Sequence, residues 1–132
     1  MLYLLDTNAF IAAMKGVGTM RERLQQVPVD ALVLSPVVLG ELSLGVAKSS
    51  FPQRNRARLA AVTAELELAP IDLEVVRHYA DIRATLERQG TPIGSNDYWI
   101  AAQGRALAAV LVTDNENEFA RVPELVVENW LR

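Results

Sequence analysis

The chain has 132 residues, of which 51% are hydrophobic and 22% charged, a composition that excludes a disordered or fibrous protein. A net charge of −3 argues against a generic basic coat for nucleic acid, although it leaves room for an enzyme that acts on one. The absence of cysteine excludes a disulfide scaffold, a thiol nucleophile and a cysteine zinc site.

The length suits a single domain, residues 1–132, with one hydrophobic core. No apolar run reaches the roughly 18 residues that suggest a membrane span. The apolar start of the chain is interrupted by Asp6 and has no basic segment before it, so it does not resemble a secretory signal. We therefore expect a cytoplasmic protein without a membrane segment.

Apolar runs of strand length alternate with helical patterns from the start of the chain. The first run precedes Thr7 and Asn8, either of which can cap a helix that ends at Gly16. The second precedes Ser35, a good N-cap, and Pro36, whose missing N–H does no harm at the first position of a helix. The predicted strands are Leu2–Leu5 and Ala31–Leu34, and the second helix extends to about Val46.

The middle of the chain begins with a polar stretch, Ser49–Arg56, that we expect to bend between two helices. Leu59–Leu68 has a helical pattern that passes into a short strand near Leu66–Ala69. Asp72 then caps a long helix that Gly90 closes. The apolar face of this helix consists of Val75, Tyr79, Ile82 and Leu86.

The last third of the chain begins with a loop, Thr91–Asn96, in which Ser95 can cap a helix from Asn96 to about Leu107. The remaining elements are a strand at Ala109–Thr113, a helical turn at Asn115–Arg121 and a brief strand at Leu125–Val127. Strands that alternate with helices imply right-handed crossovers. The sequence therefore predicts an α/β fold with a mainly parallel sheet covered on both faces.

Four acidic residues lie beside the predicted apolar runs. Asp6 and Asp114 come at the carboxyl ends of strands. Glu41 lies within the helix after the second strand, and Asp97 lies in the first turn of the helix before the strand that ends near Asp114. Ligands of open parallel sheets bind outside the carboxyl ends of the strands, so we expect all four acids to face one edge. Buried carboxylates are otherwise rare, because an isolated charge is costly to desolvate.

An all-oxygen site of this kind suits Mg²⁺ or Mn²⁺ and argues against zinc or copper. Such a cation suits phosphodiester hydrolysis, because it can activate a water, neutralise the phosphate and stabilise the leaving oxygen. Each acid alone could instead be a helix cap, a partner of the helix dipole or part of a turn. Rival chemistry lacks its motifs: there is no nucleophile elbow, phosphate loop or dinucleotide fingerprint, and the single histidine, His78, is expected at the surface.

Several motifs carry a resemblance to a known family: Leu4–Asn8, Ser35–Leu42 with Gly45, Thr91–Asp97, Ile100–Ala102, Leu111–Thr113, Glu118–Pro123 and Glu128–Trp130. In this order and spacing they resemble the PIN-domain ribonucleases of the VapC toxin group, over nearly all of the chain. The resemblance implies a three-layer α/β/α sandwich with a central, mainly parallel sheet. It also implies RNA cleavage that depends on Mg²⁺ or Mn²⁺ and inhibition by a cognate antitoxin.

The resemblance assigns roles to individual residues. Asp6 and Asp97 match the metal-binding aspartates of the family, and Glu41 matches a further catalytic acid. The fourth catalytic position is open between Asp114 and Asn115. Many relatives carry an acid or Asn where Asn115 stands, whereas the carboxylate of this chain comes one residue earlier.

Residues beside these acids are candidates for positioning the substrate. Thr7 and Asn8 follow the first aspartate, and Thr113 follows the strand before the fourth position. Trp99 stands where close relatives commonly carry an aliphatic residue. It is a candidate for stacking on an RNA base, with packing in the core or in a dimer interface as alternatives.

Three functions are possible. The first is an endoribonuclease that acts as a toxin. The resemblance implies tRNA as the substrate to test first, because some relatives cut initiator tRNA in its anticodon loop, where unpaired bases can be read. The second is a phosphohydrolase of the haloacid-dehalogenase kind, which needs a second Asp where Asn8 stands. The third is a catalytically silent PIN module, against which the repulsion among clustered acids counts.

Two kinds of protein partner are expected. A VapB-like antitoxin would insert an Arg or Lys into the acidic pocket, because a cation from another chain can pair with the carboxylates in place of the metal. A second copy of the chain would form a homodimer, since apolar residues crowd nearly every face of the helix that carries Glu41. These residues are Leu39, Leu42, Leu44 and Val46.

Overall fold

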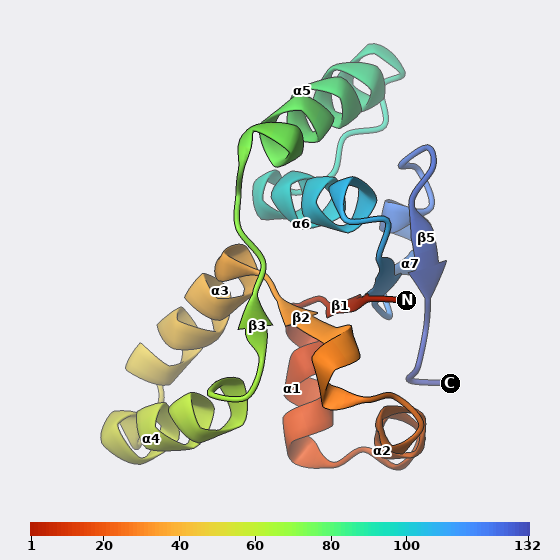
Figure 1. Cartoon of the computed structure of the whole chain (residues 1–132). Helices are drawn as coiled ribbons and strands as arrows, with labels where there is room; N and C mark the ends of the chain where they lie inside the picture. Colours follow the sequence, from red (N-terminus) through yellow and green to blue (C-terminus); the bar gives the residue numbers. More distant parts are fainter.

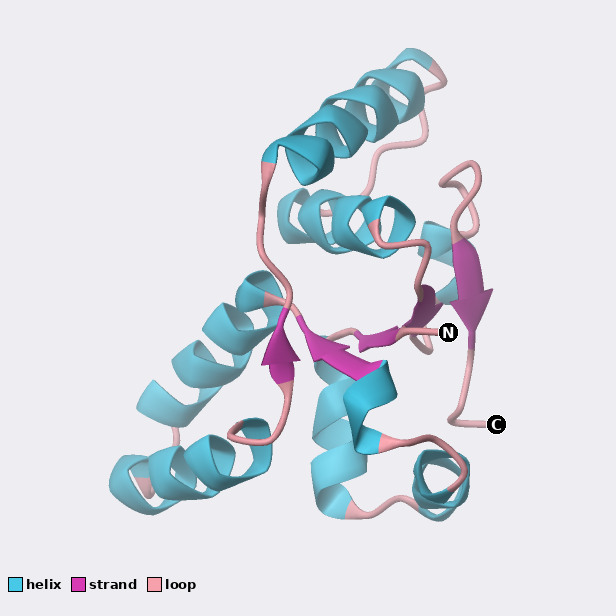
Figure 2. Cartoon of the chain, in the orientation of Figure 1, coloured by secondary structure: helices cyan, strands magenta, loops and turns pink.

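The protein, described over all 132 residues by a computed structural model, is built on a five-stranded sheet. The strands are β1 Tyr3–Leu5, β2 Leu32–Leu34, β3 Glu67–Leu68, β4 Val110–Val112 and β5 Val126–Glu128. They lie in the order β3-β2-β1-β4-β5, and every neighbouring pair is parallel. Figure 2 shows this sheet at the centre with the helices around it. The predicted parallel sheet is confirmed.

Helices cover both faces of the sheet. They are α1 Thr7–Lys15, α2 Gly18–Gln25, α3 Pro36–Ala47, α4 Pro52–Thr63, α5 Leu73–Arg88, α6 Ser95–Ala106 and α7 Glu116–Phe119, with a 3-10 turn at Val29–Ala31. Figure 1 shows α1 and α2 on one side of the sheet and α5 and α6 on the other, which confirms the three-layer α/β/α sandwich. None of these helices is both long and apolar enough to cross a membrane.

Two helical segments differ from the prediction. Helix α2 was not expected, because its sequence is mostly polar and buries only Met20. The stretch Ser49–Arg56 was expected to bend throughout, but its second half is helical because Pro52 takes the first position of α4. Helix α4 then ends at Thr63, earlier than the predicted Leu68.

The core lies between the sheet and its helical layers. Leu4 of β1 and Leu111 of β4 are fully buried at the centre of the sheet. Ala101 and Ala102 of α6 are also fully buried, so this helix approaches the sheet closely. A Cβ atom at Gly104 would lie 3.1 Å from the side chain of Leu125. The helix that carries Asp97 therefore has little freedom to shift relative to the sheet.

Two predicted helix caps are wrong. Asp6, not Thr7 or Asn8, is the N-cap of α1, and its Oδ1 accepts a hydrogen bond from the Ala9 N–H at 2.9 Å. Gly94, not Ser95, is the N-cap of α6. The predicted caps Ser35 and Asp72 are confirmed by hydrogen bonds from backbone N–H groups in the first turns of α3 and α5. The carboxylate of Asp6 is thus held at the start of α1 by a backbone N–H of the helix.

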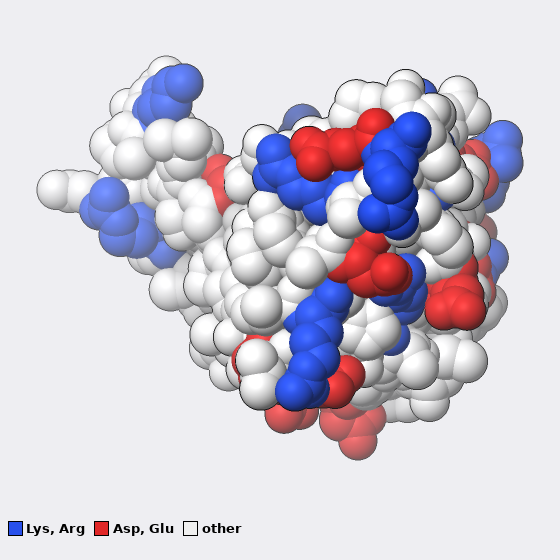
Figure 3. All heavy atoms as spheres, turned by 90° about the horizontal axis from the view of Figure 1, so that it is seen from above, with Lys and Arg blue, Asp and Glu red and all other residues white.

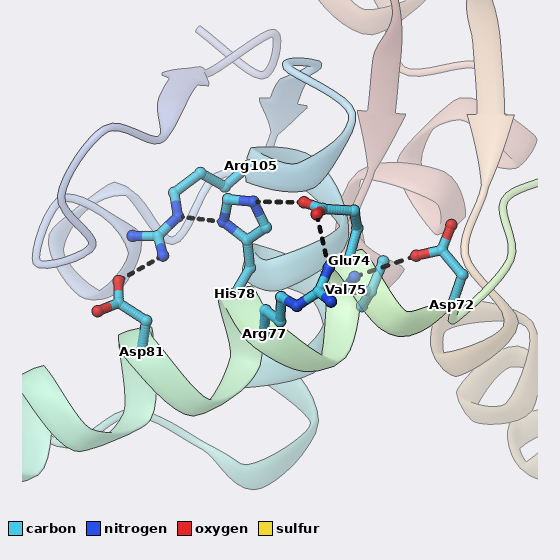
Figure 4. Close-up of polar contacts among 7 residues, drawn as sticks. All are labelled: Asp72, Glu74, Val75, Arg77, His78, Asp81 and Arg105. Atoms are coloured by element: carbon cyan, nitrogen blue, oxygen red, sulfur yellow. Dashed lines mark hydrogen bonds and ion pairs between the residues drawn. The ribbon is translucent and has the colours of Figure 1, made fainter.

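Helices α5 and α6 are joined by a buried guanidinium group. Arg105 of α6 donates from Nε to His78 Nδ1 at 2.8 Å and from Nη2 to Asp81 Oδ2 at 2.6 Å (Figure 4). Its Nη1 donates to the carbonyl oxygen of Pro123 at 3.2 Å. The side chain of Arg105 is only 8% exposed. His78 was expected at the surface, and its side chain is 27% exposed, but the ring also has a partner, because its Nδ1 accepts the hydrogen bond from Arg105.

A second polar contact joins the helices that carry two of the predicted site acids. The Ser35 hydroxyl, at the start of α3, donates to Oε1 of Gln103 in α6. Gln103 Nε2 donates in turn to the carbonyl oxygen of Ala69, just after β3, at 3.0 Å. Ser35 and Gln103 are both fully buried. Since a buried polar group without its partner is costly, this contact fixes α3 relative to α6.

Candidate active site

The first acid of the site is held at the carboxyl end of β1. Leu5 of β1 pairs with Val112 of β4, so the next residues, Asp6 and Thr113, lie side by side at one edge of the sheet. The Thr113 hydroxyl donates a hydrogen bond to Asp6 Oδ2, while Oδ1 serves as the helix cap. Asp6 is only 7% exposed. Both oxygens of a buried carboxylate are thereby fixed in direction.

The environment of Asp6 disfavours its charged form. Burial raises the pKa of Asp6, and the hydrogen bonds from Thr113 and Ala9 oppose this rise. The negative charges of Asp114 and Glu41 raise the pKa of Asp6 further. Two acidic neighbours, one after β4 and one in α3, thus act on Asp6 at the end of β1.

Glu41 reaches this edge from α3. Its Oε1 accepts a hydrogen bond from the Thr7 hydroxyl at 2.7 Å. Thr7 is the first residue of α1 and follows Asp6 directly, so the same helix start orients two acids. Glu41 is partly buried, and its charge acts on both Asp6 and Asp97.

Asp97 comes from the first turn of α6 and has the most perturbed acidity of the site. Burial, a hydrogen bond to Glu118 and the negative charges of Glu118, Glu41 and Asp6 raise the pKa of Asp97 from 3.8 to about 7. Its Oδ2 lies so near the backbone that a Cβ atom at Gly94 would come within 2.9 Å of it. The glycine is therefore needed for the carboxyl group to occupy this position.

Glu118 of α7 is an acid of the site that the sequence analysis missed. Burial would raise its pKa, but hydrogen bonds from the Gly94 N–H, Asp97 and Asn115, together with the charge of Arg121, hold the pKa of Glu118 below its usual value. The Gly94 N–H lies 2.9 Å from Oε1, and Asn115 Nδ2 lies 2.6 Å from Oε2. Asp97 and Glu118 thus form a carboxyl–carboxylate pair in which Asp97 carries the proton.

The sequence contained only a weak signal for this residue. Helix α7 has a second acid, Glu116, two residues before Glu118. Glu116 instead accepts hydrogen bonds from Asn129 and Arg132 near the C-terminus. The buried side chain of Phe119 fixes the rotation of this one-turn helix. An acid adjacent to a buried aromatic residue was the signal that could have identified Glu118.

Both candidates for the fourth position border the site. Asp114 is exposed and acts on Asp6 through its charge. Asn115 donates from its side chain to Glu118 and from its backbone N–H to Thr113 Oγ1 at 2.9 Å. Asn115 therefore belongs to the hydrogen-bonded chain of the site, whereas Asp114 contributes charge. The choice between them as catalytic residue stays a prediction.

The other predicted residues occupy different surroundings. Thr7 and Thr113 each donate to an acid of the site, and Asn8 is exposed in the first turn of α1. Trp99 stacks on Tyr79 of α5, with ring centroids 3.8 Å apart and planes inclined by 10°. It lies two positions after Asp97, which on a helix is a rotation of roughly 200°. These contacts favour the packing alternative for Trp99.

The oxygen ligands of the site suit a divalent cation. No group of three or more acidic or histidine side chains is arranged so that it could hold an ion by itself. Mg²⁺, however, usually keeps several waters and needs only one or two carboxylates plus substrate phosphate. Asp6 and Asp97 could supply these carboxylates. The raised pKa of Asp97 reflects burial first and then the crowded negative charge of its neighbours, which a cation would offset.

Comparison with known proteins identifies similar chains. Residues 3–125 match the family described as the PIN domain. "Ribonuclease VapC2" of Rickettsia felis is 36% identical over 98% of both chains, and "tRNA(fMet)-specific endonuclease VapC" of Salmonella typhimurium is 36% identical over 97% of both. In the solved structure of VapBC-1 from nontypeable Haemophilus influenzae, one chain is 35% identical over 100% of both chains, with a TM-score of 0.92.

The raised pKa of Asp97 predicts how stability depends on pH. In metal-free protein, the folded state keeps a proton on Asp97 up to a pKa of about 7, whereas the unfolded chain releases it near 3.8. The free energy of unfolding should therefore fall as the pH rises from about 4 to about 7, the window between these two pKa values. Asp97→Asn should flatten this fall in urea unfolding with EDTA present.

Asp30→Asn provides the matched control, because Asp30 is an exposed aspartate in the 3-10 turn. This variant should keep the slope of the wild-type protein. An equal slope for the wild type and Asp97→Asn would show that Asp97 is not the group that holds the proton.

Proposed function

The chain belongs to the PIN-domain family, in its VapC group, and from this premise we propose that it is a Mg²⁺- or Mn²⁺-dependent endoribonuclease that acts as a toxin. The observation that supports this most is the meeting of four acids from separate elements at one edge of the sheet. These acids are Asp6, Glu41, Asp97 and Glu118. Burial and neighbouring acids raise the pKa of Asp6 and Asp97, which costs stability, and cation-assisted hydrolysis gives such a cluster a use.

Each residue has a role that follows from its contacts. Asp6 and Asp97 would hold the cation, which when bound would neutralise phosphate charge and lower the pKa of a water. Thr113 and Thr7 orient Asp6 and Glu41 through their hydroxyl groups. Asp6 and Asp97 are thus assigned to the cation, and both oxygens of Glu118 already accept hydrogen bonds, from the Gly94 N–H and from Asn115.

Glu41 is therefore the carboxylate best placed to accept a proton. It takes part in a single hydrogen bond, from Thr7 to Oε1. In phosphodiester hydrolysis, a water oxygen bonds to phosphorus, the ester oxygen leaves with the electrons of the broken bond, and the water loses a proton. Glu41 would receive that proton, and the leaving oxygen would take one from solvent.

We propose tRNA as the substrate, with the anticodon loop of initiator tRNA as the first target. The support is the relative from Salmonella typhimurium that is named a tRNA(fMet)-specific endonuclease. Loops expose unpaired bases that a protein can read, whereas the edges of paired bases in an RNA helix are hard to reach. The alternative phosphohydrolase loses its support, because the chain is a PIN domain and carries Asn8 where that chemistry needs an acid.

Replacing the proposed ligands should remove the nuclease activity. Asp6→Asn or Asp97→Asn should reduce cleavage of initiator tRNA in Mg²⁺ buffer by about a hundredfold or more, because each change removes a ligand charge at nearly constant shape. Glu118→Gln should also reduce cleavage, since it disrupts the pair with Asp97. Glu116→Gln is the matched control on the same helix and should cleave normally. Full activity of both aspartate variants would disprove the site.

We propose that a cognate VapB-like antitoxin blocks this site with an inserted Arg or Lys. The support is that the similar solved structures from Haemophilus influenzae and Salmonella typhimurium are VapBC complexes. A guanidinium group pairs with carboxylates in a planar fork and can replace the metal.

An Ala in place of the inserted antitoxin Arg or Lys should restore cleavage in the purified complex, and Asp97→Asn should weaken the complex. If both changes were silent, the antitoxin would have to act by covering the RNA path instead.

A further inference from the structure

A hairpin that projects from the molecule differs from the rest of the chain in its charge. Beyond Glu41, the remainder of α3, the following turn and α4 form this projection, which we call the arm (residues 42–64; Figure 1). The arm contains four cationic residues and no acid: Lys48, Arg54, Arg56 and Arg58. Of the 13 Lys and Arg of the chain, 9 remain for the body, against all 16 Asp and Glu, which gives the body a net charge of −7.

The space-filling view shows the same separation. In Figure 3 the projection at the left is the arm, and basic atoms are visible along it, while acidic atoms are seen only where it joins the body. On the body, basic and acidic side chains are mixed. Arg54 and Arg56 are exposed on α4. Their charges are therefore available to a partner and are not used in ion pairs within the chain.

An open groove connects the arm to the acids of the active site. It has a volume of about 520 Å³ and extends from Glu41 along α3 to Asn55 and Arg58 of α4, with Lys15 of α1 on its wall. Arg58 Nη2 donates to the carbonyl oxygen of Met14 at 3.0 Å, which ties α4 to α1 across the groove. Apolar side chains such as Leu42, Val46 and Leu59 line much of this groove, and its polar and cationic groups lie on its walls between the arm and a carboxylate of the site.

The tip of the arm presents an exposed aromatic ring. Phe51, in the turn between α3 and α4, is 59% exposed. The guanidinium carbon of Arg54 lies 4.4 Å from the centre of its ring. An exposed aromatic ring beside an arginine is the arrangement on which proteins stack unpaired bases while they bind the neighbouring phosphate.

We propose that the arm is the element that binds RNA, with its arginines on the phosphates and Phe51 stacked on an unpaired base. A body with a net charge of −7 repels a polyanion, so the favourable approach is through the arm. The groove then directs the strand to Glu41 and the other acids. This inference rests on the proposed ribonuclease function and names the surface through which that function recognises its substrate.

The salt dependence of RNA binding tests the arginines. Full-length protein in EDTA is titrated into a fluorescein-labelled anticodon stem-loop of initiator tRNA, and the anisotropy is measured from 50 to 200 mM KCl, a range in which phosphate contacts weaken steeply. Each phosphate contact to a single strand contributes about 0.7 to the slope of log K against log salt. The double variant Arg54→Gln/Arg56→Gln loses two such contacts. It should therefore reduce the magnitude of this negative slope by about 1.4 and weaken binding.

A control with equal charge change separates contact from general electrostatics. Arg21→Gln/Arg77→Gln removes two exposed arginines from α2 and α5, far from the arm in sequence. It should keep the wild-type slope.

For the stacking contact, Phe51→Ala should weaken binding about fivefold or more, and Phe51→Leu should weaken it nearly as much, because leucine keeps apolar bulk but has no ring.

The outcomes separate this inference from the proposed function. Equal slopes for the two double variants would overturn the arm as the RNA contact, even if the protein cleaves RNA. If Arg54→Gln/Arg56→Gln and Phe51→Ala bound RNA like the wild type but no longer formed the complex with the antitoxin, the inference would also be overturned. The arm would then be a protein-docking surface. RNA binding that depends on the arm, in a protein that cleaves no RNA with Mg²⁺ or Mn²⁺, would support the inference and refute the nuclease.

Discussion

The structure depends on the placement of a carboxylate at the end of a buried parallel strand. Asp6 is only 7% exposed, and the pairing of β1 with β4 fixes its position beside Thr113. Burial and neighbouring acids make its charge unfavourable, and hydrogen bonds from Thr113 and the start of α1 only partly offset this. Asp97 lies at the same edge, where burial and neighbouring acids raise its pKa to about 7.

Polar contacts inside the fold hold this cluster against its own repulsion. The Ser35–Gln103 hydrogen bond joins α3 to α6 in the core, and the Arg105–His78 contact joins α6 to α5. The helices that carry Glu41 and Asp97 are thereby fixed to each other and to the sheet. A site made of like charges needs such a rigid frame, because otherwise its helices would separate to relieve the repulsion.

The sequence predicted what depends on local pattern, namely the parallel sheet and the acids at its strand ends. Three acids could be assigned because strand ends, helix starts and a family resemblance agreed. Glu118 could not, since its direction depends on how Phe119 anchors a single helical turn. The contact of His78 with Arg105 was not predicted either, because Arg105 follows 27 residues later in the chain. The homodimer stays a prediction. Leu44, on the helix that motivated this prediction, is 60% exposed.

The central claim is that the gathered carboxylates form a cation site, and thermal unfolding in the presence of Mn²⁺ tests it most directly. Starting from protein freed of metal, the unfolding midpoint of the wild type should rise with Mn²⁺ concentration, as linkage requires for a ligand that binds only the folded state. Asp97→Asn should begin from an equal or higher midpoint, because it relieves repulsion, and should respond much less to Mn²⁺. A wild-type midpoint that does not change with Mn²⁺, or equal rises for both proteins, would contradict the account.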